Sequence, residues 1–186
     1  FFIRIGDTCM PVVGDDVMRL ANERPGQSWE EMESRVTADG ADPGKLAALQ
    51  ARIRASARVK VSVKEKSIDE LLAHYGLAHN GRLTHLGVLV AGTAADRRAL
   101  GTAPIVQAIK YDEQGQKINK WAWDDGSRSP VELVQDIWAG IPDFRDSYEI
   151  PDGMLRSQIP AYDEKVVREL LVNALVHRPY TQTGDI

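Results

Sequence analysis

The sequence has little of several features that define common protein classes. Cys9 is the only cysteine among 186 residues, which excludes an internal disulfide and a zinc site built from cysteines. No apolar run approaches the roughly 20 residues that a membrane-spanning helix needs, and no signal peptide is recognisable. These absences predict a protein of the reducing cytoplasm that does not cross a membrane.

Several catalytic signatures are missing as well. The sequence contains no P-loop, no dinucleotide-binding glycine fingerprint and no serine–histidine–aspartate motif. Its net charge of −4 argues against a protein that coats nucleic acid through overall positive charge, but leaves a local basic patch open. With 43% hydrophobic and 27% charged residues, the chain has the composition of an ordinary globular protein of one or two domains.

The stretch with the most chemical information lies near the end of the sequence and predicts a helix. Asp163 is a candidate N-cap, because its short side chain can accept a hydrogen bond from a free N–H of the first turn. Pro179 ends the helix, since proline disfavours the α conformation in the residue before it. Apolar residues surround most of the helix between Val166 and Val176, so we expect it to be buried.

Three polar residues, Glu169, Asn173 and His177, follow one another at a spacing of four along this helix. They therefore share one face and predict a polar notch on a buried helix. One interpretation is structural: the notch faces solvent, or Glu169 bonds to another part of the core. The other is a Mg²⁺–nucleotide site, in which Asn173 supplies an oxygen ligand to the metal and Glu169 orients or deprotonates a water.

The pattern Glu169-x-x-x-Asn173-Ala-x-x-His177-Arg178-x-Tyr180 resembles the N-box of the GHKL (gyrase, histidine kinase, MutL) ATPases. More narrowly, it resembles the N-box of RecG-related transcriptional regulators of bacteria and archaea. This resemblance implies ATP and Mg²⁺ as cofactors, with Glu169 serving the attacking water and Asn173 holding the metal. It makes His177 and Arg178 candidate nucleotide contacts. Pro179 stands where this branch usually has aspartate, so no role of that aspartate carries over.

The GHKL resemblance also implies parts that this sequence does not contain. Such a site needs a later Asp-x-Gly-x-Gly box and a glycine-rich lid, and neither occurs before the sequence stops at Ile186. The sequence also starts with Phe1 and not with methionine. We therefore expect an internal fragment of a longer protein that binds ATP weakly or not at all by itself, and whether the parent hydrolyses ATP stays open.

The first residues carry a second, shorter resemblance. Phe1 to Gly6 is a β-prone run, and Phe2-Ile-Arg-Ile-Gly-Asp-Thr resembles the strand that closes the Schlafen-type AlbA domain of the same regulators. This divides the chain into a truncated AlbA-like end (residues 1–8), a linker with helices and a basic strand (9–66), a winged-helix-like unit (67–92) and an α+β region that enters a truncated GHKL-like domain (93–186).

Within the linker, residues 15–22 and 45–58 predict helices, and the alternating valines of residues 59–64 predict a strand. Basic side chains gather here. The candidate nucleic-acid contacts are Arg52, Arg54, Arg58, Lys60 and Lys64. They form either a phosphate-contacting patch or a solvated face, and no aromatic residue stands among them for base stacking.

The next segment is spaced like a small winged-helix unit. Ser67-Ile-Asp-Glu70 is a capping box that opens a helix, Asn80-Gly81 is a hairpin turn, and residues 86–92 form an apolar element. Residues 72–92 also resemble a stretch of the RecG-related regulators. Reading DNA and packing within the protein both remain open as roles for this unit.

The remaining patterns predict an α+β fold of antiparallel hairpins with helices packed on one side. Strands are expected at 103–111 and 118–123, and a second hairpin at 148–159. Ser129-Pro130 opens a helix through Trp138, and Trp121 and Trp123 share a core-facing side. The sequence thus predicts part of an ATP-binding, DNA-associated transcriptional regulator, with ATP, DNA and a second copy of the chain as candidate partners. The alternative is a non-enzymatic DNA-binding or assembly module, in which the N-box-like helix is only structural.

Overall fold

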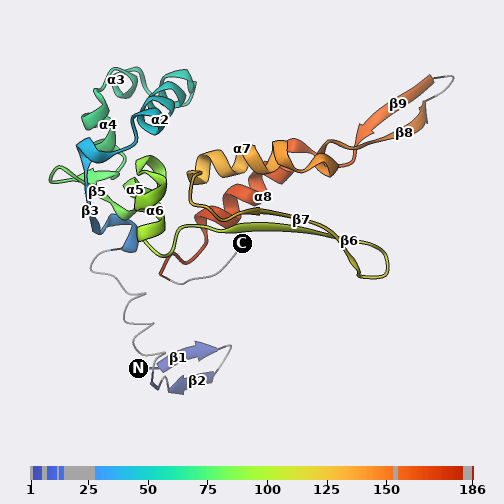
Figure 1. Cartoon of the computed structure of the whole chain (residues 1–186), viewed down its shortest axis with the longest axis horizontal. Coiled ribbons are helices and arrows are strands. Elements are labelled where there is room, and N and C mark those ends of the chain that lie inside the picture. The colour runs from blue at the N-terminus through green and yellow to red at the C-terminus, as the bar shows by residue number, and fades with distance from the viewer. Residues whose placement is uncertain (1, 6–7, 12, 15–27, 153–154, 182–185) are drawn as a thin grey trace.

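The computed structural model describes residues 2–5, 8–11, 13–14, 28–152, 155–181 and 186. They form a mixed α and β fold in which small antiparallel sheets are combined with helices (Figure 1). The strands are β1 (Phe2–Ile5), β2 (Thr8–Pro11), β3 (Glu33–Thr37), β4 (Ala78–His79), β5 (Arg82–Thr84), β6 (Val106–Tyr111), β7 (Lys117–Trp123), β8 (Ser147–Asp152) and β9 (Leu155–Pro160). The helix expected over residues 15–22 lies outside the described residues.

The helices are α2 (Pro43–Ala55), α3 (Val61–Lys64), α4 (Ile68–His74), α5 (His85–Ala91), α6 (Ala94–Ala99), α7 (Pro130–Gly140) and α8 (Glu164–Val176). Three short 3-10 turns, η1 (Trp29–Glu31), η2 (Ala38–Gly40) and η3 (Pro142–Arg145), connect other elements. β1 pairs antiparallel with β2, which confirms the first strand and gives it a partner.

Residues 29–92, which include the predicted winged-helix-like unit (67–92) and which we call the winged-helix-like segment, fold around one hydrophobic core. β3, β5 and β4 form a three-stranded antiparallel sheet in that order, and the β4–β5 turn is tight because Asn80 and Gly81 adopt positive φ angles of 48° and 74°. The core residues are Ala41, Leu72, Leu77, Leu83, Val88 and Ala91, with Leu46 and Leu49 of α2 packed against them. The expected division at residues 66 and 67 therefore runs through one core.

The predicted capping box is present at α4, where the Ser67 side chain accepts from Glu70 N and the Glu70 side chain accepts from Ser67 N. The strand predicted over residues 59–64 is wrong. Val63 N and Lys64 N both donate to Lys60 O, at 3.0 and 3.2 Å, which closes the single turn of α3. The alternation of valines does not reflect a buried face here, because the Val61 side chain is 68% exposed.

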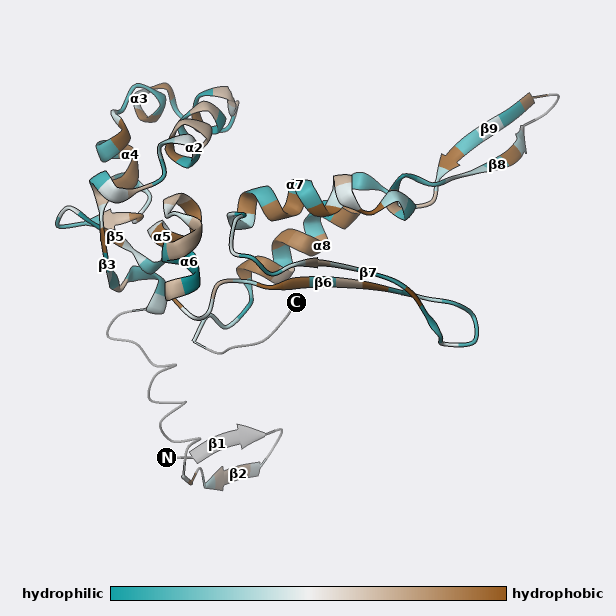
Figure 2. Ribbon diagram, viewed as in Figure 1, coloured by the Kyte–Doolittle hydropathy of each residue, from teal (hydrophilic) through white to brown (hydrophobic). Residues whose placement is uncertain are grey.

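The second core lies between a two-stranded sheet and two helices. β6 and β7 pair antiparallel, with Val106 opposite Trp123 and Ala108 opposite Trp121. The buried residues of this core are Val106, Leu133, Ile137, Ile141 and Leu175, and the two tryptophans pack against them as predicted. α7 and α8 cover one side of the β6–β7 sheet (Figure 1), and hydrophobic colouring predominates where these elements meet (Figure 2). Ile186 extends the sheet, since it donates to Ile105 O and accepts from Gln107 N on β6.

The second predicted hairpin is confirmed as β8 and β9, although its turn at residues 153–154 is outside the described residues. Tyr148 lies opposite Ile159, and Ile150 lies opposite Ser157. The hairpin projects away from α7 and α8 at one end of the molecule (Figure 1). Arg156 Nη1 and Glu149 Oε2 form a salt bridge of 2.9 Å across it.

Arg97 of α6 holds the two cores together. Its side chain is 1% exposed, and its guanidinium donates to three backbone oxygens, Gly92 O (2.6 Å), Gly126 O (2.7 Å) and Ser127 O (2.9 Å). Burial lowers the pKa of Arg97, while nearby carboxylates, foremost that of Glu132, oppose this change. Because Gly126 and Ser127 lead directly into α7, these bonds fix the start of α7 against the winged-helix-like segment.

Lys45 of α2 strengthens the same joint. Its ammonium group donates to Ser127 O at 3.1 Å and forms a salt bridge with Glu132 of α7. Ser129 N and Ser129 Oγ donate to the same Glu132 oxygen, both at 2.8 Å, as part of the capping box of α7. Burial alone would raise the pKa of Glu132, but the bonds from Lys45 and Ser129 outweigh it and lower the pKa to about 2.

Candidate functional site

The N-box-like residues lie on α8, whose start is fixed as the sequence predicts. Asp163 is the N-cap, and its carboxylate accepts hydrogen bonds from Lys165 N at 2.8 Å and Val166 N at 3.3 Å. The helix ends at Val176, with His177 as the C-cap, just before Pro179. One side of α8 is anchored by Val167 and Leu175, which are buried.

The expectation that α8 is buried nearly all round is wrong. Val166, Leu170 and Val176 are 57%, 64% and 67% exposed. The reason is geometrical: α7 and the β6–β7 sheet cover only the side of α8 that carries Leu171 and Leu175. An apolar residue on any other side of the helix has no neighbouring element to pack against within the described residues.

The row of Glu169, Asn173 and His177 lies on this uncovered part of the helix, and all three residues are exposed. Within the described residues, the Glu169 carboxylate and the Asn173 amide have no side-chain hydrogen bond or ion pair. A shallow groove beside Glu169 is lined by Lys165, Val166 and Leu170. The row therefore presents two oxygen-bearing side chains, Glu169 and Asn173, and the His177 imidazole to the outside of the protein.

Arg178, the fourth N-box-like candidate, lies apart from this row and makes contacts within the protein. Its Nη1 donates to Thr102 O at 2.8 Å, and its guanidinium carbon lies 5.1 Å from the centre of the Tyr180 ring. The Tyr180 ring is buried, and its hydroxyl donates to Leu175 O at 2.9 Å. These contacts fold the segment after α8 back onto the protein.

Tyr180 also joins α8 to the winged-helix-like segment, which the sequence did not reveal. Its ring stacks on Trp29 with 5.5 Å between centroids and 13° between planes, and Trp29 lies 4.6 Å from the ring of His85. Burial lowers the pKa of His85 and raises that of Tyr180. Trp29 and Tyr180 are about 150 positions apart in the sequence, so no local pattern could have paired them.

The basic candidates are all on or near α2 and α3, and their side chains differ in contacts and exposure. Arg52 Nη2 donates to Gln135 Oε1 of α7 at 2.7 Å, so its side chain is directed towards the second core. Arg54, Arg58 and Lys60 are exposed, and Lys64 is half-buried. Lys60 and Lys64 stand four positions apart at α3, where they share one side of the turn.

Comparison with known proteins adds a likeness of fold. No known family profile matches the chain, and a search of curated proteins finds no significant match. The crystal structure of the DIP2311 protein from Corynebacterium diphtheriae matches the whole chain with a TM-score of 0.63 and 20% sequence identity. The chain spans 35% of the length of that protein. At this identity the likeness supports the fold alone.

The described residues also bear on membrane insertion. None of their helices has the length and apolar character that are required to cross a bilayer.

Proposed function

We propose that α8 contributes the metal-binding wall of a Mg²⁺–ATP site in a longer transcriptional regulator of the RecG-related type. Asn173 would coordinate Mg²⁺ through its amide oxygen, and Glu169, one turn earlier, would orient the attacking water. The observation that supports this role is the exposed row on α8, in which both side chains lack partners among the described residues. A solvated helix face, the structural interpretation, would leave the same side chains exposed, so the ATP-binding experiment below decides between the two.

The surrounding fold is consistent with this role. α8 lies with α7 over the β6–β7 sheet, and Ile186 begins to extend that sheet beside β6. A helix layer over a sheet gives a rigid support for the Asn173 side chain, since its neighbour Leu175 is anchored in the core. The contacts of Arg178 with Thr102 and Tyr180 assign that residue to positioning this segment, while His177 stays a candidate nucleotide contact.

The test is ATP binding by the longest natural protein that carries this chain. Isothermal titration calorimetry with Mg²⁺ and ATP is expected to show binding for the wild type and none for Asn173→Ala. Gln158→Ala, which removes a similar amide from the exposed β9 strand, serves as the matched control. Unchanged affinity in the Asn173 variant would remove the nucleotide assignment. For the 186-residue chain alone, we expect weak binding or none, and a micromolar dissociation constant would contradict this.

A second candidate function is DNA binding without catalysis. The β3–β5–β4 sheet with α2, α4 and α5 has the general layout of a winged-helix unit, and basic side chains are exposed on α2 and α3 beside it. Phosphate contacts by lysine and arginine would make DNA affinity fall steeply with salt.

Charge reversal tests this candidate at α3. Lys60→Glu with Lys64→Glu is expected to weaken binding to a duplex DNA and to flatten the dependence of affinity on salt by about two counterions. Lys117→Glu with Lys120→Glu, on β7 far along the sequence, is the matched control. DNA affinity that is absent, or that does not change with salt, would exclude the DNA-binding role.

A further inference from the structure

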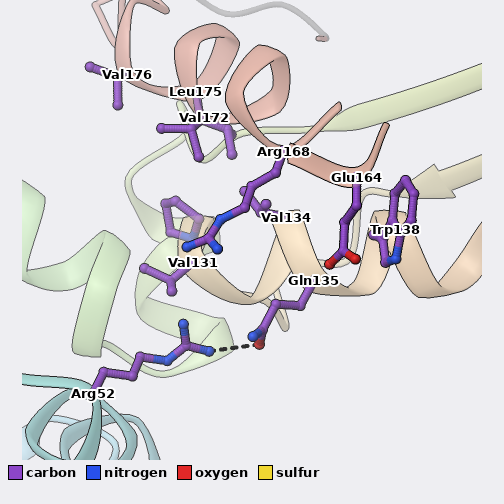
Figure 3. A pocket seen from close by; sticks show the side chains of 11 residues that line it. Arg52, Val131, Val134, Gln135, Trp138, Glu164, Arg168, Val172, Leu175 and Val176 are labelled. Carbon is purple, nitrogen blue, oxygen red and sulfur yellow. Dashed lines mark hydrogen bonds between the residues drawn. The ribbon is translucent and has the colours of Figure 1, made fainter. Parts of the chain in front are cut away.

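A pocket of about 440 Å³ lies between α7 and α8, with α2 at its border (Figure 3). Its walls are mainly apolar and are formed by Val131, Val134, Trp138, Val172 and Leu175. Small-molecule sites in proteins typically have volumes of roughly 300–1,000 Å³ and apolar walls with a few charged groups. The pocket has this size and this type of lining.

Most pocket residues of α8 come from a different side of the helix than Glu169 and Asn173, while Val176, which also lines the pocket, lies one turn after Asn173. Arg168, Val172 and Leu175 line it, whereas Glu169 and Asn173 do not. At about 100° per residue, Arg168 and Val172 point away from Asn173. Because Glu169 and Asn173 do not line the pocket, the inference does not depend on the nucleotide proposal.

Two arginines and one acid, Glu164, line the pocket, so positive charge is in excess there. Arg168 reaches in from α8 and Arg52 from α2 (Figure 3). Arg52 bonds to the neutral amide of Gln135 at 2.7 Å. Among the residues that the structure describes, no carboxylate lies within 4.0 Å of either guanidinium group.

The charges are distributed unevenly along the pocket. The guanidinium of Arg168 lies towards Val131, whereas the carboxylate of Glu164 lies towards Trp138 (Figure 3). Pro130 and Val131, at the first turn of α7, line the end of the pocket where Arg168 lies. One end of the pocket is thus suited to an anion, and Glu164 disfavours an anion at the other end.

We infer that this pocket binds a small organic anion, with its acidic group between Arg168 and Arg52 and its apolar body against the valines and Trp138. A guanidinium pairs well with carboxylate, sulfonate or phosphate oxygens because its N–H groups are held in a planar fork. The apolar walls require a hydrocarbon or aromatic body on the ligand, since bare inorganic anions would leave them uncovered. Such a ligand bridges α2, α7 and α8, and so connects the two cores.

The test uses two fluorescent probes with the same ring system. 8-Anilinonaphthalene-1-sulfonate carries an acidic group, and N-phenyl-1-naphthylamine does not. Titration of the 186-residue chain is expected to show one sulfonate site per chain, with a dissociation constant about tenfold below that of the neutral probe. Octanoate is expected to displace the sulfonate probe, whereas acetate and inorganic phosphate are not.

Substitutions test the contribution of the Arg168 charge and that of the apolar cavity separately. Arg168→Gln is expected to weaken sulfonate binding about tenfold and to leave the neutral probe unchanged. Arg54→Gln removes the same charge from α2 at a position that does not line the pocket, and it should change neither probe. Val172→Trp fills the cavity and is expected to abolish binding of both probes. Thermal unfolding confirms that each variant is folded.

Several results would overturn the inference. These are equal affinity for both probes, an unchanged sulfonate affinity in folded Arg168→Gln, binding that survives Val172→Trp, or displacement by inorganic phosphate as effective as displacement by octanoate. The last result would identify a simple anion site with no use for the apolar walls.

Discussion

Replacing Glu132 with glutamine is expected to remove a defined, pH-dependent part of the stability of the chain. The Glu132 carboxylate accepts from Lys45 Nζ, Ser129 N and Ser129 Oγ, and its pKa is lowered from 4.5 to about 2. Glutamine keeps the size of the side chain and one acceptor oxygen, but it has no charge to pair with Lys45. The variant therefore tests the ion pair at the joint between α2 and α7.

The expected loss in the free energy of unfolding follows from the difference between the pKa of Glu132 in the folded and in the unfolded state. The interval from 4.5 to about 2, at about 1.4 kcal/mol for each unit of pH, corresponds to about 3 kcal/mol. The Glu132 side chain is 32% exposed, and solvent screening reduces this to about 2 kcal/mol. Because the folded pKa is the lower one, this stabilisation is complete above pH 4.5 and is lost as the pH falls towards 2.

The assay is urea unfolding of wild type and Glu132→Gln at intervals between pH 6 and pH 3. The difference in the free energy of unfolding is expected to be about 2 kcal/mol at pH 6 and to shrink steadily below pH 4.5. Contributions from other carboxylates occur in both proteins and cancel in this difference. A difference that stays constant from pH 6 to pH 3 would refute the reasoning.

Glu70→Gln is the matched control, because Glu70 occupies the same third position of a capping box on α4. Its pKa is also lowered, chiefly by the backbone N–H of Ser67, but it has no ion pair like that of Glu132 with Lys45 among the described residues. The change in stability of this exposed control is expected to be smaller than that of Glu132→Gln.

Two further substitutions test the packing of the fold by urea unfolding. Arg97→Met leaves three backbone oxygens without their donor and is expected to cost about 3–5 kcal/mol; the exposed Arg98→Met is the control, and a loss below about 1 kcal/mol would contradict the role of Arg97. Gly87→Ala places a Cβ 1.8 Å from Leu77 O, a main-chain atom that cannot move independently, and is expected to cost about 3 kcal/mol. Gly44→Ala, whose Cβ would meet only a side-chain oxygen at 3.2 Å, should be much milder, and equal effects would show that the contact is relieved elsewhere.

The sequence predicted the elements whose signals are local. The capping box at Ser67, the helix start at Ser129-Pro130 and the N-cap at Asp163 each depend on residues within one helical turn, and all three are present. The hairpin turn at Asn80-Gly81 is likewise determined by two residues that tolerate positive φ angles. In these places the side chains that determine the structure are neighbours in the sequence.

Predictions that depended on distant parts of the chain were less successful. β3 pairs with β5, more than 40 residues later, and the sequence around Trp29 gave no clear signal for it. The alternating pattern of Val59, Val61 and Val63 is also compatible with a short helical turn. A segment as short as the four residues of α3 cannot distinguish the two-residue period of a strand from the 3.6-residue period of a helix. The burial of α8 was overestimated because composition shows how apolar a helix is, and not which sides its neighbours cover.

At the candidate site, too, the sequence predicted local geometry but not contacts between distant residues. The spacing of Glu169 and Asn173 correctly placed them on one helix face, since that follows from helical geometry alone. The sequence gave no sign that Arg178 would bond to Thr102, or that Arg52 would turn towards Gln135. Both contacts are made by long, flexible side chains to partners at least 76 residues away, so they become visible only when the chain is folded.

The joint formed by Arg97 has an evolutionary consequence. Its acceptors are main-chain oxygens of Gly92, Gly126 and Ser127, and every residue type provides such an oxygen. Side chains in the loop of residues 124–127 can therefore diverge between species without loss of the joint, provided that the backbone keeps its course. Gly126 is the exception, because its φ of +68° and the 3.0 Å approach of Arg98 Cγ exclude most replacements. Natural variation should thus be free along this loop and restricted at Arg97 and Gly126.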